Sequence, residues 1–563
     1  MTSTIDDLEE KRPEESGAWE LNRTLMHLPA RQRLDAILAR ADGEAVVAGL
    51  AEQDFYFFVK EIGPHDALPL LAFASVDQIN HLFDLEWWQK DTVLPAKAVE
   101  WLALLAKASE AKLLAWLYKV DFELLVTLFR KWLRVSVLQE DEDLLEAGDS
   151  MPKHTIDDQY FFESRYPQYE DFLKGLLSLI FEVHYGFYRE LLNHVIAALD
   201  TVVEEEAYRF HRGRLEDRAI PDYFDALEIY RSLRPAEVVP AKGAVPSATI
   251  SSQAPSFALA LLPERDLLSR VLVAIRDSEI LNGVQLELAS LANKVMVADQ
   301  LPPDNSEALR RAVEKMAAYV NLGLEMKSKG DPKTARKVVE QVFLEHLFRL
   351  GQTQVARMRD LMRKVRERGW LSRWPAGLNC LDAGWLEPAE LMLAKTPMLL
   401  RPASSSDSPP RQDLFRTQRD LLDAKQFIDV VMALGPLFDS LSVEPERVEI
   451  LLWKEGQIQE LGDVTLGAMI WTAAARFRHE GKRVVDPIPM ALWPDLFPLL
   501  GPGAMEDAIR SWVHEITADP TQLGLLDAYL NPLFRAYEEE TAPFLDAAPP
   551  DPRLMKLFLF QEL

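Results

Sequence analysis

The feature that most constrains the fold is the recurrence of short amphipathic segments between Arg31 and Val135. Three of these segments align on an aspartate near their starts, and they read LAEQDFYFFV, ASVDQINHLF and LYKVDFELLV. The aspartates are Asp54, Asp77 and Asp121, so the second spacing is close to twice the first. Aspartate in the first turn of a helix complements the unpaired backbone N–H groups and the helix dipole. The pattern therefore predicts short helices that begin at these three positions.

Apolar residues follow each aspartate near helical spacing, as Phe55, Phe58 and Val59 do after Asp54. Two short helices cannot bury such apolar faces alone, but stacked units supply the missing contacts. We therefore expect superhelical repeats of short helices at the N-terminal end of the chain.

The rest of the sequence also favours helices, because alternating β-branched runs are scarce. Residues 175–217 have the length of two helices and almost no Gly or Pro. Capping residues predict a helix from Asn305 to Lys329, and Asp331-Pro332 begins another that reaches Gly351. The predicted fold class is all-α, with superhelical repeats followed by helical bundles and a possible minor β element in the C-terminal part. The segment VEILLW at 448–453 is the ambiguous one.

Shifts in composition divide the chain into domains. A stretch rich in Pro, Ala and Ser at 235–255 is the clearest linker, and RPASSSDSPPRQD at 401–413 is a second break. The expected ranges are a disordered N-terminus at 1–18, a helical repeat domain at 19–135, a helical bundle region at 136–234, the linker at 235–255, a helical domain at 256–400, the break at 401–413 and a mostly helical domain at 414–563.

The LxxxDxxxLL-like texture of residues 28–135 resembles the helical repeat module of the cytoplasmic N-terminal domain of MgtE-type magnesium transporters and of the flagellar motor switch protein FliG. The chain lacks the transporter's membrane domain. The resemblance thus implies a shared interaction or regulatory module rather than transport.

Three further segments, HTIDDQYFFE, EEEAYRFHRGRLEDR and IPDYFDALEIY, resemble an uncharacterised family of large bacterial proteins whose domain is known only as one of unknown function. That resemblance spans most of the chain. It implies a bacterial origin and brings no activity or site residues.

Charge and cysteine content narrow the classes of function. The chain of 563 residues has 62 Lys and Arg against 89 Asp and Glu, a net charge of −27 that repels nucleic acid. Its single cysteine, Cys380, fits a reducing cytoplasm. The acidic N-terminus has no signal-like apolar core, and no apolar run is long enough to span a membrane. We expect a cytoplasmic protein without a cofactor.

No sequence motif indicates a reaction, because GxxxxGK[ST], GxGxxG, HExxH and GxSxG are all absent. The chain is therefore expected to be a binding protein rather than an enzyme, although catalytic groups can converge from distant segments.

The densest group of functional side chains lies near Glu204–Tyr230. Arginine forks bind phosphate or carboxylate, so this group is a candidate anion site. The alternative is a solvated helix end whose charges pair with one another. The candidate ligand-binding residues are Arg209, His211, Arg212, Arg214 and Asp217.

Four other groups of side chains fit ordinary structural roles. His184, Glu190 and His194 lack the second copy that a di-metal helical bundle needs, so we predict no metal site. The acidic run 140–149 lacks the spacing of a calcium loop. The basic segment at 357–373 fits an amphipathic helix whose outer face could bind an acidic segment of this chain, a partner or nucleic acid. Trp370, Trp374 and Trp385 fit either a pocket or anchors for irregular chain.

The leading functional hypothesis is a cytoplasmic protein–protein interaction scaffold or regulatory adaptor whose partner is another protein. The alternative is a helical enzyme or small-anion sensor that uses the arginine and histidine cluster at 209–218. The sequence favours neither nucleic acid nor membrane as a partner, and it leaves the oligomeric state undetermined.

Overall fold

A computed structural model describes residues 28–138, 151–242, 254–264, 266–303, 305–402, 409–441, 443–446, 448, 461–544 and 549–561, the side chain of Asp200 excepted. Several expectations lie outside these residues. They are the disordered N-terminus at 1–18, the acidic run 140–149, most of the linker, residues 403–408 of the 401–413 break, and the segment after Val448.

The chain forms two compact units. Unit 1 comprises residues 1–231, 236–320 and 327–348, and unit 2 comprises residues 232–235, 321–326 and 349–563. Residues 1–231, before the expected linker, and residues 256–320, after it, therefore belong to the same unit. The finer division into domains stays a prediction.

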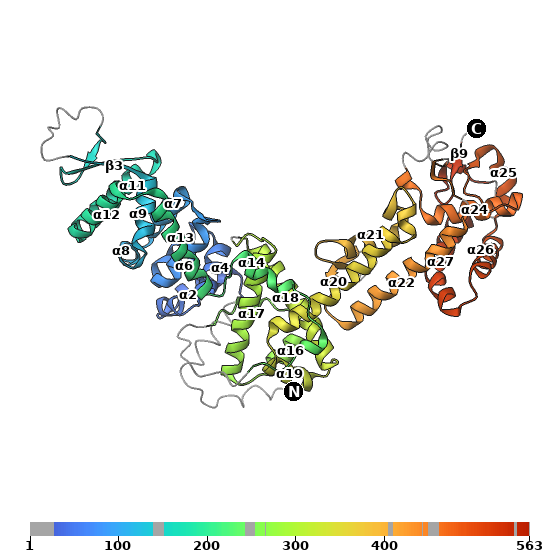
Figure 1. Cartoon of the computed structure of the whole chain (residues 1–563), viewed down its shortest axis with the longest axis horizontal. Helices are drawn as coiled ribbons and strands as arrows, with labels where there is room; N and C mark the ends of the chain where they lie inside the picture. Colours follow the sequence, from blue (N-terminus) through green and yellow to red (C-terminus); the bar gives the residue numbers. More distant parts are fainter. Residues whose placement is uncertain are drawn as a thin grey trace. The chain divides into compact units, whose positions relative to one another are not determined.

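Unit 1 begins with short helices in close succession, coloured blue to teal in Figure 1. They are α2 (Ala30–Leu38), α3 (Gly43–Ala48), α4 (Glu52–Ile62), α5 (Leu68–Phe73), α6 (Val76–Glu86), α7 (Pro95–Ala108), α8 (Glu110–Lys119) and α9 (Phe122–Trp132). The strands β1 (Trp88–Gln89) and β2 (Thr92–Val93) form a small hairpin between α6 and α7.

The three recurrent aspartates do stand at helix starts, at the beginning of α4, α6 and α9. None of them caps its own helix through its side chain. Ser75 instead caps α6 in a capping box with Gln78, whereas Asp77 forms an exposed ion pair with Lys119 at 2.6 Å. The aspartates therefore lie at the helix starts, but their carboxylates bind groups outside their own helices.

A large aromatic cluster holds these helices together. Phe83 stacks on Trp87 with 4.1 Å between ring centroids, and the ring edge of Trp116 meets both of them. All three side chains are buried. Offset and edge-to-face aromatic pairs of this kind add to the stabilisation from burial alone.

Three helices continue unit 1 where the sequence predicted two. They are α11 (Glu170–Val183), α12 (Tyr185–Ala197) and α13 (Asp200–Asp217). The chain turns at His184, whose Nδ1 accepts a hydrogen bond from the backbone N–H of Phe187 at 2.8 Å and so begins α12. The strands β3 (Leu133–Val137), β4 (His154–Thr155) and β5 (Tyr160–Ser164) form an antiparallel sheet before these helices, with β5 in the centre.

The remainder of unit 1 comprises α14 (Tyr223–Leu227), α15 (Phe257–Ala260), α16 (Leu267–Val273), α17 (Ser278–Ala298), α18 (Ser306–Ser328) and α19 (Pro332–Gln341), with residues 321–326 of α18 assigned to unit 2. Asp54 of α4 binds the start of α15, where its carboxylate accepts bonds from the N–H groups of Ser256 and Phe257, each at 2.8 Å. The first helices of the chain thus contact residues beyond the Pro-rich stretch.

The caps of α18 and α19 confirm the predicted helix starts. Asn305 accepts from the N–H groups of the first turn of α18, and Asp331 accepts from Thr334 N at 2.8 Å. Gly330 between these helices has a positive φ of 77°, which glycine adopts without strain.

The prediction that the helix after Asp331 continues to Gly351 was wrong. Helix α19 ends at Gln341, Val342 is extended, and a new helix, α20 (Leu344–Arg368), follows. Distant groups account for the break. The Gln341 carbonyl accepts bonds from the N–H groups of Ala241 and Lys242, and Glu287 accepts from Leu344 N at 2.8 Å.

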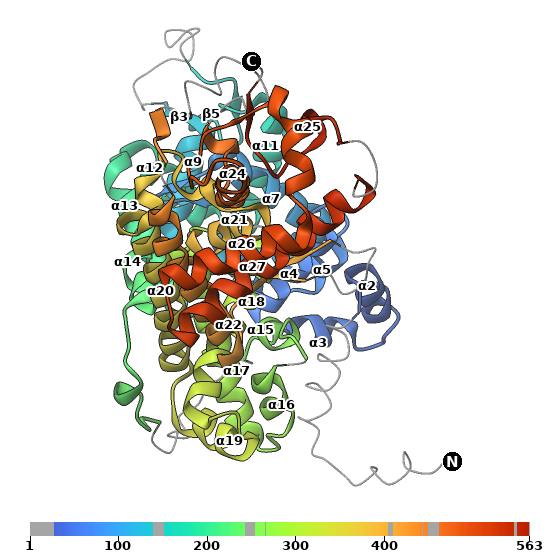
Figure 2. The ribbon, with the colours of Figure 1, turned by 90° about the vertical axis from the view of Figure 1, so that its right-hand side faces the viewer.

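Unit 2 is also mostly helical, and its later helices are the orange and red ones of Figures 1 and 2. Its elements are α20 from Arg349 onward, the 3-10 helices η5 (Trp370–Arg373) and η6 (Gly377–Cys380), α21 (Ala383–Leu393), β6 (Met398–Arg401), β7 (Arg411–Leu414), α22 (Gln418–Ser440), α24 (Leu466–Glu480), β8 (Ile488–Pro489), α25 (Trp493–Leu496), α26 (Pro502–Ile516), α27 (Pro520–Thr541) and β9 (Phe560–Gln561).

The predicted fold class is confirmed. Helices dominate the described residues, and the expected minor β element in the C-terminal part is present as the parallel pair β8–β9 and the antiparallel hairpin β6–β7. Trp370 and Trp374 are buried, and Trp370 Nε1 donates to the Val431 carbonyl at 2.7 Å. Trp370 therefore anchors η5 to α22.

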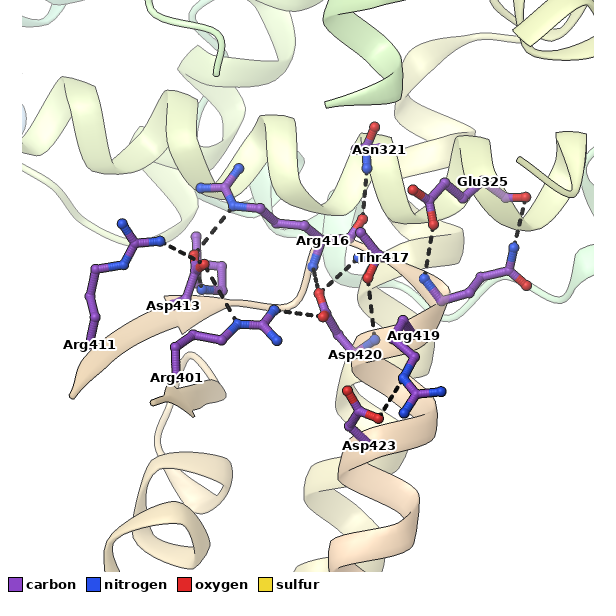
Figure 3. A network of polar contacts seen from close by, with 12 residues as sticks. Asn321, Glu325, Arg401, Arg411, Asp413, Arg416, Thr417, Arg419, Asp420 and Asp423 are labelled. Atoms are coloured by element: carbon purple, nitrogen blue, oxygen red, sulfur yellow. Dashed lines mark hydrogen bonds and ion pairs between the residues drawn. The ribbon is translucent and has the colours of Figure 1, made fainter. Parts of the chain in front are cut away.

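A polar network fixes the β6–β7 hairpin to the start of α22 (Figure 3). The buried Asp420 carboxylate accepts from Arg401 at 2.6 Å and from the N–H groups of Arg416 and Thr417. The neighbouring Asp413 is buried against Arg416. Burial alone would raise the pKa of Asp413, but attraction to Arg416 and the bonds it accepts lower that pKa below its usual value.

Candidate interaction site on helix α13

Helix α13 carries all five candidate residues that the sequence singled out, and it packs against α9 and α6. At 3.6 residues per turn, Ala207, His211 and Arg214 share one side of the helix. Ala207 and His211 are buried, so this side faces the earlier helices. The opposite side is exposed.

Arg214 makes the central contact of the inner side. Its Nε and Nη2 atoms donate to the two carboxylate oxygens of Asp84 at 2.9 and 2.7 Å, and its Nη1 atom donates to Asp121. Asp84 belongs to α6, and Asp121 immediately precedes α9. A two-point contact between guanidinium and carboxylate is strong and directional. Arg214 therefore binds α13 to two of the short N-terminal helices at once.

His211 reinforces this contact. Its Nδ1 atom lies 3.1 Å from Asp84 Oδ1, and its ring stacks on Trp88 with 4.3 Å between centroids. Burial by itself would raise the pKa of Asp84, but the hydrogen bonds from Arg214 and His211 outweigh burial and lower it. Asp84 is therefore held as a buried carboxylate.

His81 of α6 completes what we call the Arg214 cluster, which consists of His81, Asp84, Asp121, His211 and Arg214. His81 is fully buried, and neither of its ring nitrogens has a hydrogen-bond partner among the described residues. Burial, followed by repulsion from Arg218, lowers the pKa of His81 to about 3. The imidazole is therefore neutral at physiological pH.

The other candidate residues lie apart from this cluster. Arg212 is bound to Glu216 at 2.9 Å and to Asp222, on the surface of unit 1. Arg209 lies over the ring of Phe210, and Asp217 is exposed. The five residues thus do not converge on one point. Anion binding stays a prediction, and an anion at Arg214 would have to compete with Asp84 and Asp121.

The outer side of α13 has a different character. Leu199, just before the helix, is 71% exposed, Val202 is 49% exposed and Phe210 is 39% exposed. Spacings of three and eight residues place them within about 80° of one another around the helix, on the exposed flank beside the inner side, where Phe210 precedes Arg214 by one turn. Exposed apolar side chains are ordinary when scattered, but a series along one helix is typical of an interaction site.

Acidic side chains flank these apolar residues. Glu205, Glu206 and Asp217 have no ion-pair partner among the described residues, whereas Glu204 is paired with Lys131. Together with Arg209, which lies over Phe210, these residues form the α13 outer face, defined as Leu199, Val202, Glu205, Glu206, Arg209, Phe210 and Asp217. It combines apolar surface with unpaired negative charge.

The described residues contain no group of three or more His, Cys, Asp or Glu side chains placed to hold a metal ion. His184 caps the start of α12, and His194 Nδ1 lies 2.8 Å from the Glu190 carbonyl in the same helix. Cys380 is buried, and burial raises the pKa of its thiol, so it is no activated nucleophile.

Sequence reasoning found the basic half of the Arg214 cluster and missed Asp84 and His81. Asp84 lies 130 residues from Arg214 in the chain. No local signal distinguishes Asp84 from Asp77, which lies seven residues earlier on the same helix and is exposed.

The fold and the site define a mostly helical protein. Its helix α13 is held by ion pairs on its buried side and is exposed to solvent elsewhere. No helix among the described residues is long and apolar enough for a bilayer crossing. The family model described as a family of unknown function, DUF6178, matches residues 13–561, and the chain belongs to this family. No curated protein and no solved structure matched the chain.

Proposed function

We propose that this protein is a cytoplasmic adaptor that binds a partner protein through the α13 outer face. The observation that supports the proposal is the exposure of Leu199, Val202 and Phe210 on a helix whose buried side is fixed by the Arg214 cluster. A fixed helix loses little conformational freedom on binding, so more of the contact energy becomes affinity.

The chemistry of the outer face favours a basic amphipathic helix as the partner segment. Leu199, Val202 and Phe210 match the apolar side of such a helix, and Glu205, Glu206 and Asp217 match its lysines or arginines. An amphipathic helix that docks on another surface uses apolar anchor residues three, four and seven positions apart. Charge complementarity would speed association and select against acidic partners.

The cytoplasmic assignment rests on composition. A single, buried and unpaired cysteine suits a reducing compartment.

The first test uses the full-length protein and a labelled 18-residue helical peptide of leucine and lysine. The variant Leu199→Ser, Val202→Ser, Phe210→Ser removes the apolar anchors. The control variant Leu38→Ser, Val239→Ser, Val273→Ser makes matched changes at exposed apolar residues elsewhere in unit 1. We expect fluorescence anisotropy to report at least tenfold weaker binding for the outer-face variant only. Equal weakening in both variants would refute the proposal that the α13 outer face binds the peptide.

The second test addresses the adaptor role itself. Affinity capture from an extract of the source cells is carried out with the wild type and with both variants. We expect one protein to be retained by the wild type and the control but not by the outer-face variant. That protein, once purified, must bind directly and through a basic segment. Failure of this direct binding would leave the adaptor role without support, whatever the model peptide does.

A further inference from the structure

The second half of α20 is strongly basic, although the chain as a whole is acidic. Residues 349–368 contain seven Lys and Arg and only two acidic residues, in a protein with a net charge of −27. This part of α20 belongs to unit 2. Its charge therefore does not reflect the average composition of the surface.

Several of these basic side chains are already bound. Arg363 pairs with Asp360 and Arg366 with Glu367, each at 2.8 Å. Arg359 donates to the Lys395 carbonyl at 3.1 Å, which places the loop after α21 on that side of α20.

Three basic side chains remain without a partner. Arg357, Lys364 and Arg368 are exposed, and none has an ion-pair or hydrogen-bond partner among the residues that the structure describes. Their spacings of seven and four residues place them in one row along the helix. The partly buried Leu361 lies in the same row. We call Arg357, Lys364 and Arg368 the α20 basic stripe.

The stripe lies on the side of α20 away from Arg359. Two residues correspond to about 200° around a helix, so Arg357 and Arg359 point in nearly opposite directions. The buried residues Val355, Met358 and Met362 occupy a third side. The stripe is therefore covered neither by the core of unit 2 nor by the loop that contacts Arg359.

We propose that the α20 basic stripe is a docking surface for an acidic polypeptide segment of a partner protein. A rise of 1.5 Å per residue separates Arg357 from Lys364 by about 10 Å and Lys364 from Arg368 by about 6 Å along the helix. An extended peptide advances about 3.3 Å per residue, so carboxylates two or three residues apart reach successive members of the stripe. Leu361 offers an apolar contact between them.

An acidic polypeptide fits the stripe better than nucleic acid does. The negative charge of the whole chain repels a continuous phosphate backbone, and the pairing of Arg363 with Asp360 and of Arg366 with Glu367 leaves no continuous basic track beside the stripe. A short peptide can place its carboxylates on the stripe alone. This surface lies in unit 2 and is independent of the α13 outer face in unit 1.

The test compares two labelled probes, poly-L-glutamate and a 20-nucleotide oligothymidylate, on the full-length protein at several salt concentrations. The stripe variant is Arg357→Glu, Lys364→Glu, Arg368→Glu. The control variant, Lys97→Glu, Lys107→Glu, Lys337→Glu, makes the same change in charge at exposed, unpaired lysines of unit 1. A milder variant replaces the three stripe residues by Gln and guards against loss of folding.

We expect poly-L-glutamate to bind the wild type and the control equally, and at least tenfold more weakly to both stripe variants, with affinity falling as salt rises. Equal weakening in the control would overturn the proposal, because net charge alone would then explain binding. Oligothymidylate binding as tight as that of poly-L-glutamate, and lost in the stripe variants, would identify a nucleic-acid surface instead. Unchanged binding in the Gln variant would also overturn the proposal.

Discussion

Arg214 and Asp84 meet through two parallel hydrogen bonds of 2.9 and 2.7 Å, although they lie 130 residues apart in the chain. The Asp84 side chain is almost completely buried, and that of Arg214 is 17% exposed. Removing one partner of such a pair leaves an uncompensated buried charge, which costs more than the pair contributes. Helix α13 therefore depends on this contact.

The first prediction concerns this ion pair. We expect Arg214→Leu to lower the free energy of unfolding of unit 1 by about 3–5 kcal/mol, because Asp84 stays buried without its main partner. Urea unfolding followed by tryptophan fluorescence measures the change. Arg212→Leu, on the surface, is the control and is expected to cost less than about 1 kcal/mol. The double variant Asp84→Leu, Arg214→Leu is expected to be more stable than Arg214→Leu, and a less stable double variant would contradict this account.

The second prediction concerns pH. The pKa of His81 is about 3 in the folded protein and about 6.5 when unfolded, so only the unfolded state takes up a proton between these values. The stability is therefore complete above about pH 6.5 and falls as the pH is lowered, by up to ~1.4 kcal/mol per pH unit. His81→Leu removes this dependence and breaks no hydrogen bond.

Urea unfolding of the wild type and His81→Leu at pH 7.5, 5.5 and 4.5 tests this. Carboxylates such as Asp84 titrate in both proteins. The difference in unfolding free energy between the wild type and His81→Leu therefore reports the contribution of His81 alone. We expect similar stability at pH 7.5 and a widening advantage for His81→Leu in acid. Parallel stability curves would show that His81 is not held neutral.

The third prediction concerns the network of Figure 3. Asp420→Ala removes the acceptor of the Arg401 side chain and of two backbone N–H groups, and we expect it to destabilise unit 2 by about 3 kcal/mol. Asp423→Ala, one turn along α22, breaks only the exposed pair with Arg419 and is expected to cost less than about 1 kcal/mol. Thermal unfolding compares the two, and equal costs would contradict the structural role of Asp420.

The fourth prediction concerns Cys380. Its thiol is fully buried, and burial raises its pKa, so almost no reactive thiolate forms at neutral pH. We expect Ellman's reagent to label the native protein slowly and to label one thiol per chain promptly in concentrated urea. Prompt labelling of the native protein would show that the region around η6 opens readily.

Local signals in the sequence predicted the helix starts well, because caps act within one turn. Asn305 and Asp331 bind N–H groups two or three residues ahead of them. The end of α19 was beyond such reasoning, since the groups that fix it, Ala241, Lys242 and Glu287, come from elsewhere in unit 1. Periodicity likewise predicted two helices over 175–217 where the structure has α11, α12 and α13, because it did not reveal the histidine cap at His184.

The candidate site was predicted only in part, for a related reason. The run from Arg209 to Arg218 identifies α13 as charged, but sequence spacing does not reveal that Arg214 faces Asp84 while Arg212 faces solvent. The exposure of Leu199 and Val202 is equally invisible, because an apolar residue on a helix is normally expected in the core. Tertiary contacts decide which side of a charged helix remains open.

The bond between Asp54 and the start of α15 sets an order of events during synthesis. Ser256 and Phe257 follow Asp54 by 202 and 203 residues. At about 5–20 residues per second, a ribosome delivers them roughly 10–40 s later. Throughout that interval the nascent helices exist without the backbone donors that Asp54 binds in the finished protein. A polypeptide that ends before Ser256 therefore leaves the Asp54 carboxylate without its partners from α15.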